Sequence, residues 1–219
     1  MKLLVTGGTG FIGTPLICEL LRQNVNLIAC VRHHSTKLPS VVNQVIIDDL
    51  SSFANWTGSL IGVDVVIHLA ARVHIMNDKS LDPLTEFRKI NTVATLNLAR
   101  QAAKSGIKRF IFLSSIKVNG ELTKNGIPFR PDDRFIPADP YGRSKYEAEQ
   151  GLLAIAEETG MEVVIIRSPL VYGVGVKANF ASMVKWVHRG TPLPFGAIHN
   201  QRSLVALDNL VSFIIHCIA

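Results

Sequence analysis

The sequence predicts an α/β fold in which a doubly wound parallel sheet carries helices on both faces. Short apolar runs alternate with helical segments over most of the chain, and the run over 63–71 is apolar almost without interruption. Continuous apolarity is typical of a strand that is covered on both faces. Repeated strand–helix–strand units imply right-handed crossovers between parallel strands, and ligands of such sheets bind outside the carboxyl ends of the strands.

Element boundaries follow from residues with known end preferences. After the apolar run that opens the chain, the expected strands lie at 26–31, 44–47, 63–71, 109–113 and 162–166. Asp82 followed by Pro83 marks the start of a helix that Gly106 ends, and Gly160 closes a second helix over 141–159. Two more helices are expected over 178–188 and from Asp208 to the end of the chain.

The first strand breaks into a glycine-rich turn and continues as a helix. Gly8 can adopt the backbone angles of the turn, Gly10 lets a pyrophosphate approach the main chain, and Gly13 lets the helix pack on the strand. Free N–H groups and the positive end of the helix dipole then face the phosphates. Glycines also serve any tight strand-to-helix turn, but this position in the chain favours a Rossmann-like dinucleotide site.

Composition argues against several other classes of protein. The three cysteines lack paired spacing, so neither a disulfide framework nor a metal site is predicted. The net charge of +6 is dispersed, which fits an anionic small ligand at least as well as nucleic acid, and no nucleic-acid partner is expected. No apolar run approaches the about 20 residues that cross a bilayer, and no leader precedes the first strand, so we expect a cytoplasmic protein without membrane insertion.

Tyr141 and Lys145 are four residues apart near a helix start, so they lie on one face of that helix. Ser115 closes the fifth strand, at the edge of the sheet where a ligand would lie. A free tyrosine has a pKa of about 10, and lowering it by three units means stabilising the phenolate by roughly 4 kcal/mol. Lys145 and an oxidised nicotinamide can supply the positive charge that stabilises the phenolate. Alone, such a pair is usually a surface feature, but a glycine turn and a strand ending in serine make the combination specific.

Together these residues resemble an extended short-chain dehydrogenase/reductase of the nucleotide-sugar epimerase/dehydratase family. Gly7, Gly10 and Gly13 match the Gly-x-x-Gly-x-x-Gly turn of that family, with Phe11 and Ile12 inside it. Tyr141 and Lys145 match its Tyr-x-x-x-Lys pair, and Ser115 its active-site Ser/Thr. The resemblance implies that the tyrosine is the acid/base, that the serine bonds the reacting oxygen, and that the lysine lowers the tyrosine pKa and holds the nicotinamide ribose.

Further cofactor and substrate contacts are implied by the same resemblance. Asp49 and Leu50 resemble the acidic and apolar residues that lie beside the adenine in this family. The segment His68-Leu69-Ala70-Ala71 resembles the end of the fourth strand, which lines the cofactor. Asn91 resembles the asparagine of the following helix that steadies the site. Asn179 and Arg202 resemble residues that hold the diphosphate of the substrate, the arginine through a charge-assisted fork. An Asn or Arg in a loop is by default solvated, which leaves both of these assignments open.

The sequence departs from the family pattern in three places. Val118-Asn119-Gly120 stands where many members have Val-Tyr-Gly, so a tyrosine is missing there. Arg32 lies near the end of the second strand, where an NAD enzyme places an acid, and it suits the 2′-phosphate of NADP unless it simply points into water. Family members are usually longer, so we expect residues 1–167 to form an NAD(P)-binding domain and residues 168–219 to carry only part of a substrate-binding portion.

The resemblance therefore implies an enzyme that moves a hydride between NAD(P) and a sugar carbon. A 4-epimerase of a UDP-hexose or UDP-N-acetylhexosamine, similar to UDP-glucose 4-epimerase, is preferred. An NADPH-dependent 4-ketoreductase of a UDP-4-keto-6-deoxy sugar, in the synthesis of surface polysaccharide, is one alternative. A non-catalytic dinucleotide-binding module is another, although Ser115, Tyr141 and Lys145 are all present. The oligomeric state is left open, with a homodimer as one form.

Overall fold

Six parallel strands form the main sheet, which confirms the predicted fold class. The computed structural model describes residues 1–47, 53–73, 81–123, 126–133, 135–176, 178–192, 196–197 and 201–219. The strand order is β3-β2-β1-β4-β5-β6. The strands are β1 (Lys2–Thr6), β2 (Asn26–Val31), β3 (Asn43–Ile46), β4 (Val65–His68), β5 (Arg109–Ser115) and β6 (Glu162–Ser168).

Strand β1 lies at the centre of the sheet, between β2 and β4. Lys2 pairs with Asn26 on one side and Leu3 pairs with Val65 on the other. From β1 the chain therefore builds outward in one direction through β2 and β3, and in the other through β4, β5 and β6. A crevice forms where the winding reverses, outside the carboxyl ends of β1 and β4.

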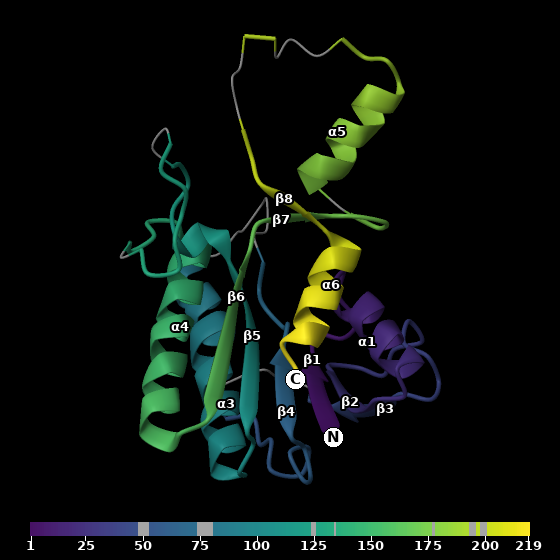
Figure 1. The fold of residues 1–219 in the computed structure, drawn as a ribbon, viewed down its shortest axis with the longest axis vertical. Helices are drawn as coiled ribbons and strands as arrows, with labels where there is room; N and C mark the ends of the chain where they lie inside the picture. Colours follow the sequence, from purple (N-terminus) through teal and green to yellow (C-terminus); the bar gives the residue numbers. More distant parts are fainter. Residues whose placement is uncertain are drawn as a thin grey trace.

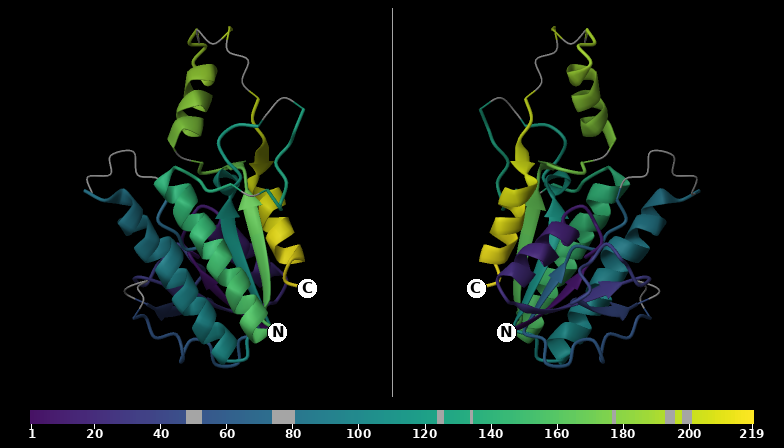
Figure 2. Two further views of the ribbon diagram at one scale, coloured as in Figure 1. Left: turned by 90° about the vertical axis from the view of Figure 1, so that its left-hand side faces the viewer. Right: turned by 90° about the vertical axis from the view of Figure 1, so that its right-hand side faces the viewer.

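Helices cover both faces of the sheet (Figures 1 and 2). On one face α1 (Gly13–Arg22) packs beside α6 (Leu207–His216), and Leu16, Ile17, Leu210 and Ile214 belong to one buried cluster with β1. On the other face α3 (Thr95–Lys104) and α4 (Pro140–Thr159) bury Leu98 and Leu152 against the sheet. Each face of the sheet is thus shielded from water, as its continuous apolar runs require.

A smaller unit lies beyond the carboxyl ends of the strands (Figure 1). It contains a parallel pair, β7 (Leu170–Tyr172) and β8 (Leu204–Ala206), which the sequence did not predict, and the expected helix α5 (Ala178–His188). Helix α6 follows β8 directly and returns to the main sheet against α1, so it completes the core of the first part. The division of the chain at residue 167 remains a prediction. Among the described helices, none is long and apolar enough to cross a membrane.

The helix expected from Asp82 to Gly106 is not regular. It consists of α2 (Pro83–Phe87), a π-helical segment η1 (Arg88–Ala94) and α3. Asp82 caps it as predicted, with its side chain accepting from the Thr85 N–H at 3.1 Å. A π segment widens the helix locally, so residues on either side of it face directions that a regular helix would not give them.

A histidine in the sheet joins β1, β4 and α3. His68 is 2% exposed, and its two ring nitrogens lie 2.7 Å from Thr6 Oγ1 and 2.9 Å from Thr95 Oγ1. The ring stacks on Phe112 with centroids 5.9 Å apart. Burial, and secondly the charge of Lys145, lower the pKa of His68 from 6.5 to about 3, so its ring is neutral near neutral pH.

We expect Gly13→Ala to destabilise the fold. A methyl group at this position would lie 2.7 Å from the Cα of Gly8 and would also overlap the Gly7 carbonyl, both of them backbone atoms. Overpacking of this kind costs about 1–3 kcal/mol. Denaturant unfolding should show the loss, whereas Gly58→Ala, which places its methyl group in open space, should leave stability nearly unchanged. Equal stability of the two variants would contradict the close approach of helix and turn.

We also expect His68 to make stability depend on pH. The unfolded chain takes up this proton near pH 6.5 and the folded chain only near pH 3. Between these values the unfolded state binds more protons, so the free energy of unfolding falls as pH falls, by at most about 1.4 kcal/mol per pH unit. His68→Gln should flatten this slope between pH 6.5 and 4, and His216→Gln, at an exposed position, should keep it. A wild-type slope in His68→Gln would refute the assignment.

Candidate active site

A cavity of about 830 Å³ lies at the carboxyl ends of the central strands. Most of the residues proposed from the sequence line it, from the glycine turn, the ends of β2, β4 and β5, and the start of α4. They are Gly7, Gly10, Phe11, Ile12, Gly13, Arg32, Leu69, Ala70, Ala71, Ser115, Tyr141 and Lys145. The parallel sheet therefore brings together residues that are up to 138 positions apart, from Gly7 to Lys145.

The glycine-rich turn closes one end of this cavity. Gly7 has a φ of +71°, and a side chain on it would lie 2.7 Å from the Ala70 nitrogen. Gly7, and not Gly8 as expected, is therefore the residue with left-handed backbone angles, because the end of β4 passes close to it. Gly8 instead faces Ile17 of α1.

This end of the cavity fits the pyrophosphate of a dinucleotide. A side chain on Gly10 would meet only the Gly7 carbonyl oxygen, at 3.1 Å, and is otherwise in open space. Helix α1 begins at Gly13 without a side-chain cap and without an acidic residue in its first turn. The Thr14 and Leu16 N–H groups already donate to the Gly10 and Ile12 carbonyls, and Pro15 has no N–H, so what this helix start offers an anion is the positive end of its dipole.

Ser115, Tyr141 and Lys145 line the same cavity. Asp139 caps α4, with its side chain accepting from the Gly142 N–H at 2.8 Å, and this fixes the first turn that carries Tyr141. The Ser115 hydroxyl is close enough to the phenol to lower the pKa of Tyr141. Lys145, one turn further on, is 1% exposed, and its Nζ lies 4.1 Å from the centre of the Phe112 ring.

The electrostatics of the two ionisable groups are dominated by burial. Burial raises the pKa of Tyr141, the neighbouring Ser115 hydroxyl opposes that rise, and the charge of Asp139 adds to it. Burial lowers the pKa of Lys145 from 10.5 to about 7, and the carboxylate of Glu149 acts in the other direction. Near neutral pH the phenol is therefore protonated, while the lysine is close to its midpoint, where small changes in its surroundings alter its charge.

Asn91 is buried beside the cavity and connects two of its walls. Its side chain accepts from the Arg72 N–H at 2.8 Å and donates to the Arg72 carbonyl at 3.0 Å and to Ser144 Oγ at 3.0 Å. Ser144 Oγ in turn donates to the Tyr141 carbonyl at 2.8 Å. Asn91 thus ties the segment after β4 to the first turn of α4. A contact of Asn91 with cofactor remains a prediction.

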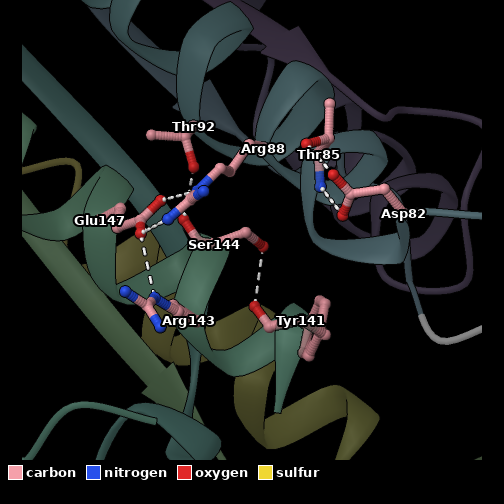
Figure 3. Close-up of polar contacts among 8 residues, drawn as sticks. All are labelled: Asp82, Thr85, Arg88, Thr92, Tyr141, Arg143, Ser144 and Glu147. Atoms are coloured by element: carbon pink, nitrogen blue, oxygen red, sulfur yellow. Dashed lines mark hydrogen bonds and ion pairs between the residues drawn. The ribbon is translucent and has the colours of Figure 1, made fainter. Parts of the chain in front are cut away.

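The π-helical segment adds two contacts to the same turn of α4 (Figure 3). Thr92 Oγ1 donates to the Ser144 carbonyl at 2.8 Å, and Arg88 forms an ion pair with Glu147 at 2.6 Å. The irregular winding of η1 lets Asn91, Thr92 and Arg88 all reach α4. Sequence reasoning missed this, because a π segment has no recognised residue signature.

Other side chains near the site were also missed. Arg72 lines the cavity and its guanidinium lies 5.5 Å from the centre of the Phe87 ring, which in turn contacts the Tyr141 ring edge-on. Glu149 is fully buried and bonds Ser114 and Arg167. The spacing of Tyr141, Lys145 and Glu149, four residues each, was a signal that could have revealed Glu149.

Four of the predicted site residues remain, and only Arg202 among them has a described side chain. Asp49 and Leu50 lie outside the described residues, and so does the side chain of Asn179, whose backbone belongs to the first turn of α5. Arg202 is exposed, precedes β8, and does not line the cavity. Within the described part of the chain no cluster of three or more His, Cys, Asp or Glu side chains could hold a metal ion.

Comparison with known proteins adds three findings. UDP-glucose 4-epimerase of Vibrio cholerae is 50% identical over 99% of this chain, which spans 66% of that relative. The structure of UDP-glucose 4-epimerase from Thermotoga maritima with UDP-glucose superposes with a TM-score of 0.80 at 27% identity, over 97% of this chain and 71% of that one. The structure of MoeE5 with UDP-glucose and NAD superposes with a TM-score of 0.79 at 26% identity, over 98% of this chain and 71% of that one.

The model of the NAD dependent epimerase/dehydratase family matches residues 3–219. That match covers the glycine turn, the cavity and the Ser115–Tyr141–Lys145 group together. The chain belongs to the NAD dependent epimerase/dehydratase family.

Proposed function

We propose that this chain carries the cofactor-binding and catalytic part of a UDP-sugar 4-epimerase, acting on a UDP-hexose or UDP-N-acetylhexosamine. The observation that carries the proposal is that Ser115, Tyr141 and Lys145 line the same cavity as the glycine turn. The identity of 50% with the Vibrio cholerae UDP-glucose 4-epimerase supports the 4-epimerase over other reactions of the family.

Each residue has a distinct task in this proposal. The turn Gly7–Gly10–Gly13 and the N-terminus of α1 hold the cofactor pyrophosphate, and Leu69 to Ala71 line the cofactor. The nicotinamide, when bound, accepts and returns the hydride. Tyr141 Oη takes the proton of the sugar hydroxyl and gives it back, and it does so as the phenolate that the positive charge of Lys145 makes accessible. Ser115 Oγ orients the same oxygen. Asp49 and Leu50 are proposed at the adenine.

Two further residues are proposed for the diphosphate of the substrate. Asn179 is in the first turn of α5 and Arg202 precedes β8, two elements that lie beyond the carboxyl ends of the main strands (Figure 1). An arginine at such a place binds a diphosphate through a charge-assisted fork. The UDP-glucose bound by the Thermotoga relative supports a nucleotide-sugar ligand. A homodimer and a cytoplasmic location remain predictions.

The direct test is product identification. The chain is incubated with UDP-glucose, UDP-galactose and their N-acetylated counterparts, with NAD or NADP, and the sugars are separated and identified. Interconversion of the 4-epimers supports the proposal. Release of a 4-alcohol only from UDP-4-keto sugars with NADPH would instead identify the ketoreductase. Cofactor binding without any turnover would favour the non-catalytic module.

Tyr141→Phe should lower kcat by about 100-fold or more while the dissociation constant of the cofactor stays within a factor of two. Only the proton transfer is lost, and general acid–base groups contribute about 10²–10⁴-fold. Steady-state rates and isothermal calorimetry measure the two effects. The control is Tyr146→Phe, which removes a hydroxyl from the next turn of the same helix and should keep wild-type kcat. Wild-type turnover in Tyr141→Phe would remove Tyr141 from the mechanism.

Arg32 should favour NADP over NAD. It lines the cavity at the end of β2 and is exposed, and the neighbouring residues His33, His34 and Ser35 include no acid for a ribose 2′-hydroxyl. Arg32→Ala should weaken NADP binding about 10-fold and leave NAD binding nearly unchanged, as measured by calorimetry. NADP binding no tighter than NAD in the wild type, or an unaltered ratio in the variant, would contradict this preference.

A further inference from the structure

A buried ion pair lies directly behind the Ser115–Tyr141–Lys145 group. Glu149 of α4 is 0% exposed, and Arg167 of β6 donates to its two carboxylate oxygens from Nε at 3.2 and 3.1 Å and from Nη2 at 2.7 Å. Ser114 Oγ of β5 donates to the same carboxylate at 2.5 Å. One carboxylate therefore joins three elements, α4, β5 and β6, at the carboxyl end of the sheet.

Ser114 and Ser115 are held by different partners at the end of β5. Ser114 Oγ donates to Glu149 of α4. Ser115 Oγ accepts from the Lys117 N–H at 3.3 Å and lowers the pKa of Tyr141, in the first turn of α4. Since Tyr141 belongs to the same helix as Glu149, the carboxylate fixes the strand and helix that carry the two hydroxyls.

Arg167 extends the junction to the loop that precedes α4. Its Nη1 donates to Asn119 Oδ1 at 3.1 Å and to the Pro131 carbonyl at 3.0 Å. Asn119 Nδ2 donates to the Arg130 carbonyl at 2.6 Å. The asparagine that replaces the tyrosine of the Val-Tyr-Gly pattern is therefore buried and bonded, and it is not a vacant position in the site.

We propose that Glu149 and Arg167 are a positioning pair for this site: they lock β5 against α4 so that Ser115 faces Tyr141, and they place a carboxylate one helical turn from Lys145. This inference rests on the proposed function for its catalytic consequence. Neither residue lines the cavity, so neither is assigned a contact with cofactor or sugar.

The charge of Lys145 depends on few neighbours. His68 of β4 is neutral, and the ring of Phe112 of β5 lies 4.1 Å from Nζ. On α4 itself the neighbours one turn away are Tyr141, protonated near neutral pH, and Glu149. Within the described part of the chain, Glu149 is the group whose charge raises the pKa of Lys145 against the effect of burial.

The first experiment compares Glu149→Gln with the wild-type chain. Glutamine keeps the size of the side chain and an oxygen for Ser114 and Arg167 but removes the charge. The titration of Lys145, followed by NMR of ¹³Cε-labelled lysine and assigned with Lys145→Arg, should move to lower pH by roughly one unit. With UDP-sugar, kcat at pH 7 should fall about 10-fold, with KM changed less than twofold, and the alkaline limb of the kcat profile should move to lower pH.

Two further variants separate positioning from loss of folding. Glu149→Gln leaves Arg167 without its carboxylate, so Glu149→Gln/Arg167→Gln replaces the pair by neutral groups that can bond each other. We expect this double variant to melt closer to wild type and to keep both the shifted Lys145 titration and the reduced kcat. The matched control is Glu147→Gln, on the same helix and in an ion pair with Arg88 at 2.6 Å, which should change neither quantity.

Failure of the positioning pair and failure of the proposed function give different results in these experiments. If the wild-type chain converts no UDP-sugar, the proposed function fails, and the NMR titration still tests the positioning pair. If Glu149→Gln folds and shows the wild-type Lys145 titration, or if Glu147→Gln shifts it equally, the pair is structural and the inference is overturned.

Discussion

The site depends on one constraint: every strand of the main sheet runs in the same direction. The carboxyl ends of β1, β4, β5 and β6 therefore lie at one edge, and so do the residues that follow them. The crevice at this edge lies between β1 and β4, where the chain changes its direction of winding. Short turns after β1 and β4 bring Gly7 within van der Waals distance of Ala70, which leaves room for backbone only. A bulkier turn would push these strand ends apart and fill the place proposed for phosphate.

A second constraint is the burial of charge at this edge. Lys145 is 1% exposed and Glu149 is 0% exposed, and charges so placed are costly unless they are paired and hydrogen-bonded. The carboxylate is satisfied by Arg167 and Ser114, whereas the ammonium has the face of an aromatic ring and a carboxylate one turn away. Helix α4 can hold Lys145 in a buried position because these neighbouring groups compensate for the hydration that its charge loses. The pKa of such a buried lysine changes strongly when a ligand adds or removes charge nearby.

Sequence reasoning predicted the features that depend on local pattern. The turn after β1, the cap at Asp82, the serine at the end of β5 and the Tyr141–Lys145 pair all follow from spacing within a few residues. It did not predict the left-handed angles of Gly7 in place of Gly8, because these arise from the approach of β4, which lies about 60 positions away in the chain. The π segment, the pair β7–β8 and the Arg167–Glu149 contact were missed for the same reason. Each of these features depends on contacts with residues distant in the sequence, and no residue type within the segments themselves predicts it.

Asn119 shows how a departure from a family pattern can be compensated. A tyrosine missing at this position suggested a gap in the site, yet the asparagine bonds Arg167 and the Arg130 carbonyl and so fixes the loop in front of α4. The side chains from Lys145 through Glu149 to Arg167 form a row whose charges alternate in sign. Removing an end of the row leaves the other two neutralised, whereas removing the charge in the middle leaves the partly buried Arg167 without its carboxylate and lowers the pKa of Lys145 further. The fold is therefore expected to tolerate the loss of Lys145 better than the loss of the Glu149 charge, although only Lys145 reaches the cavity.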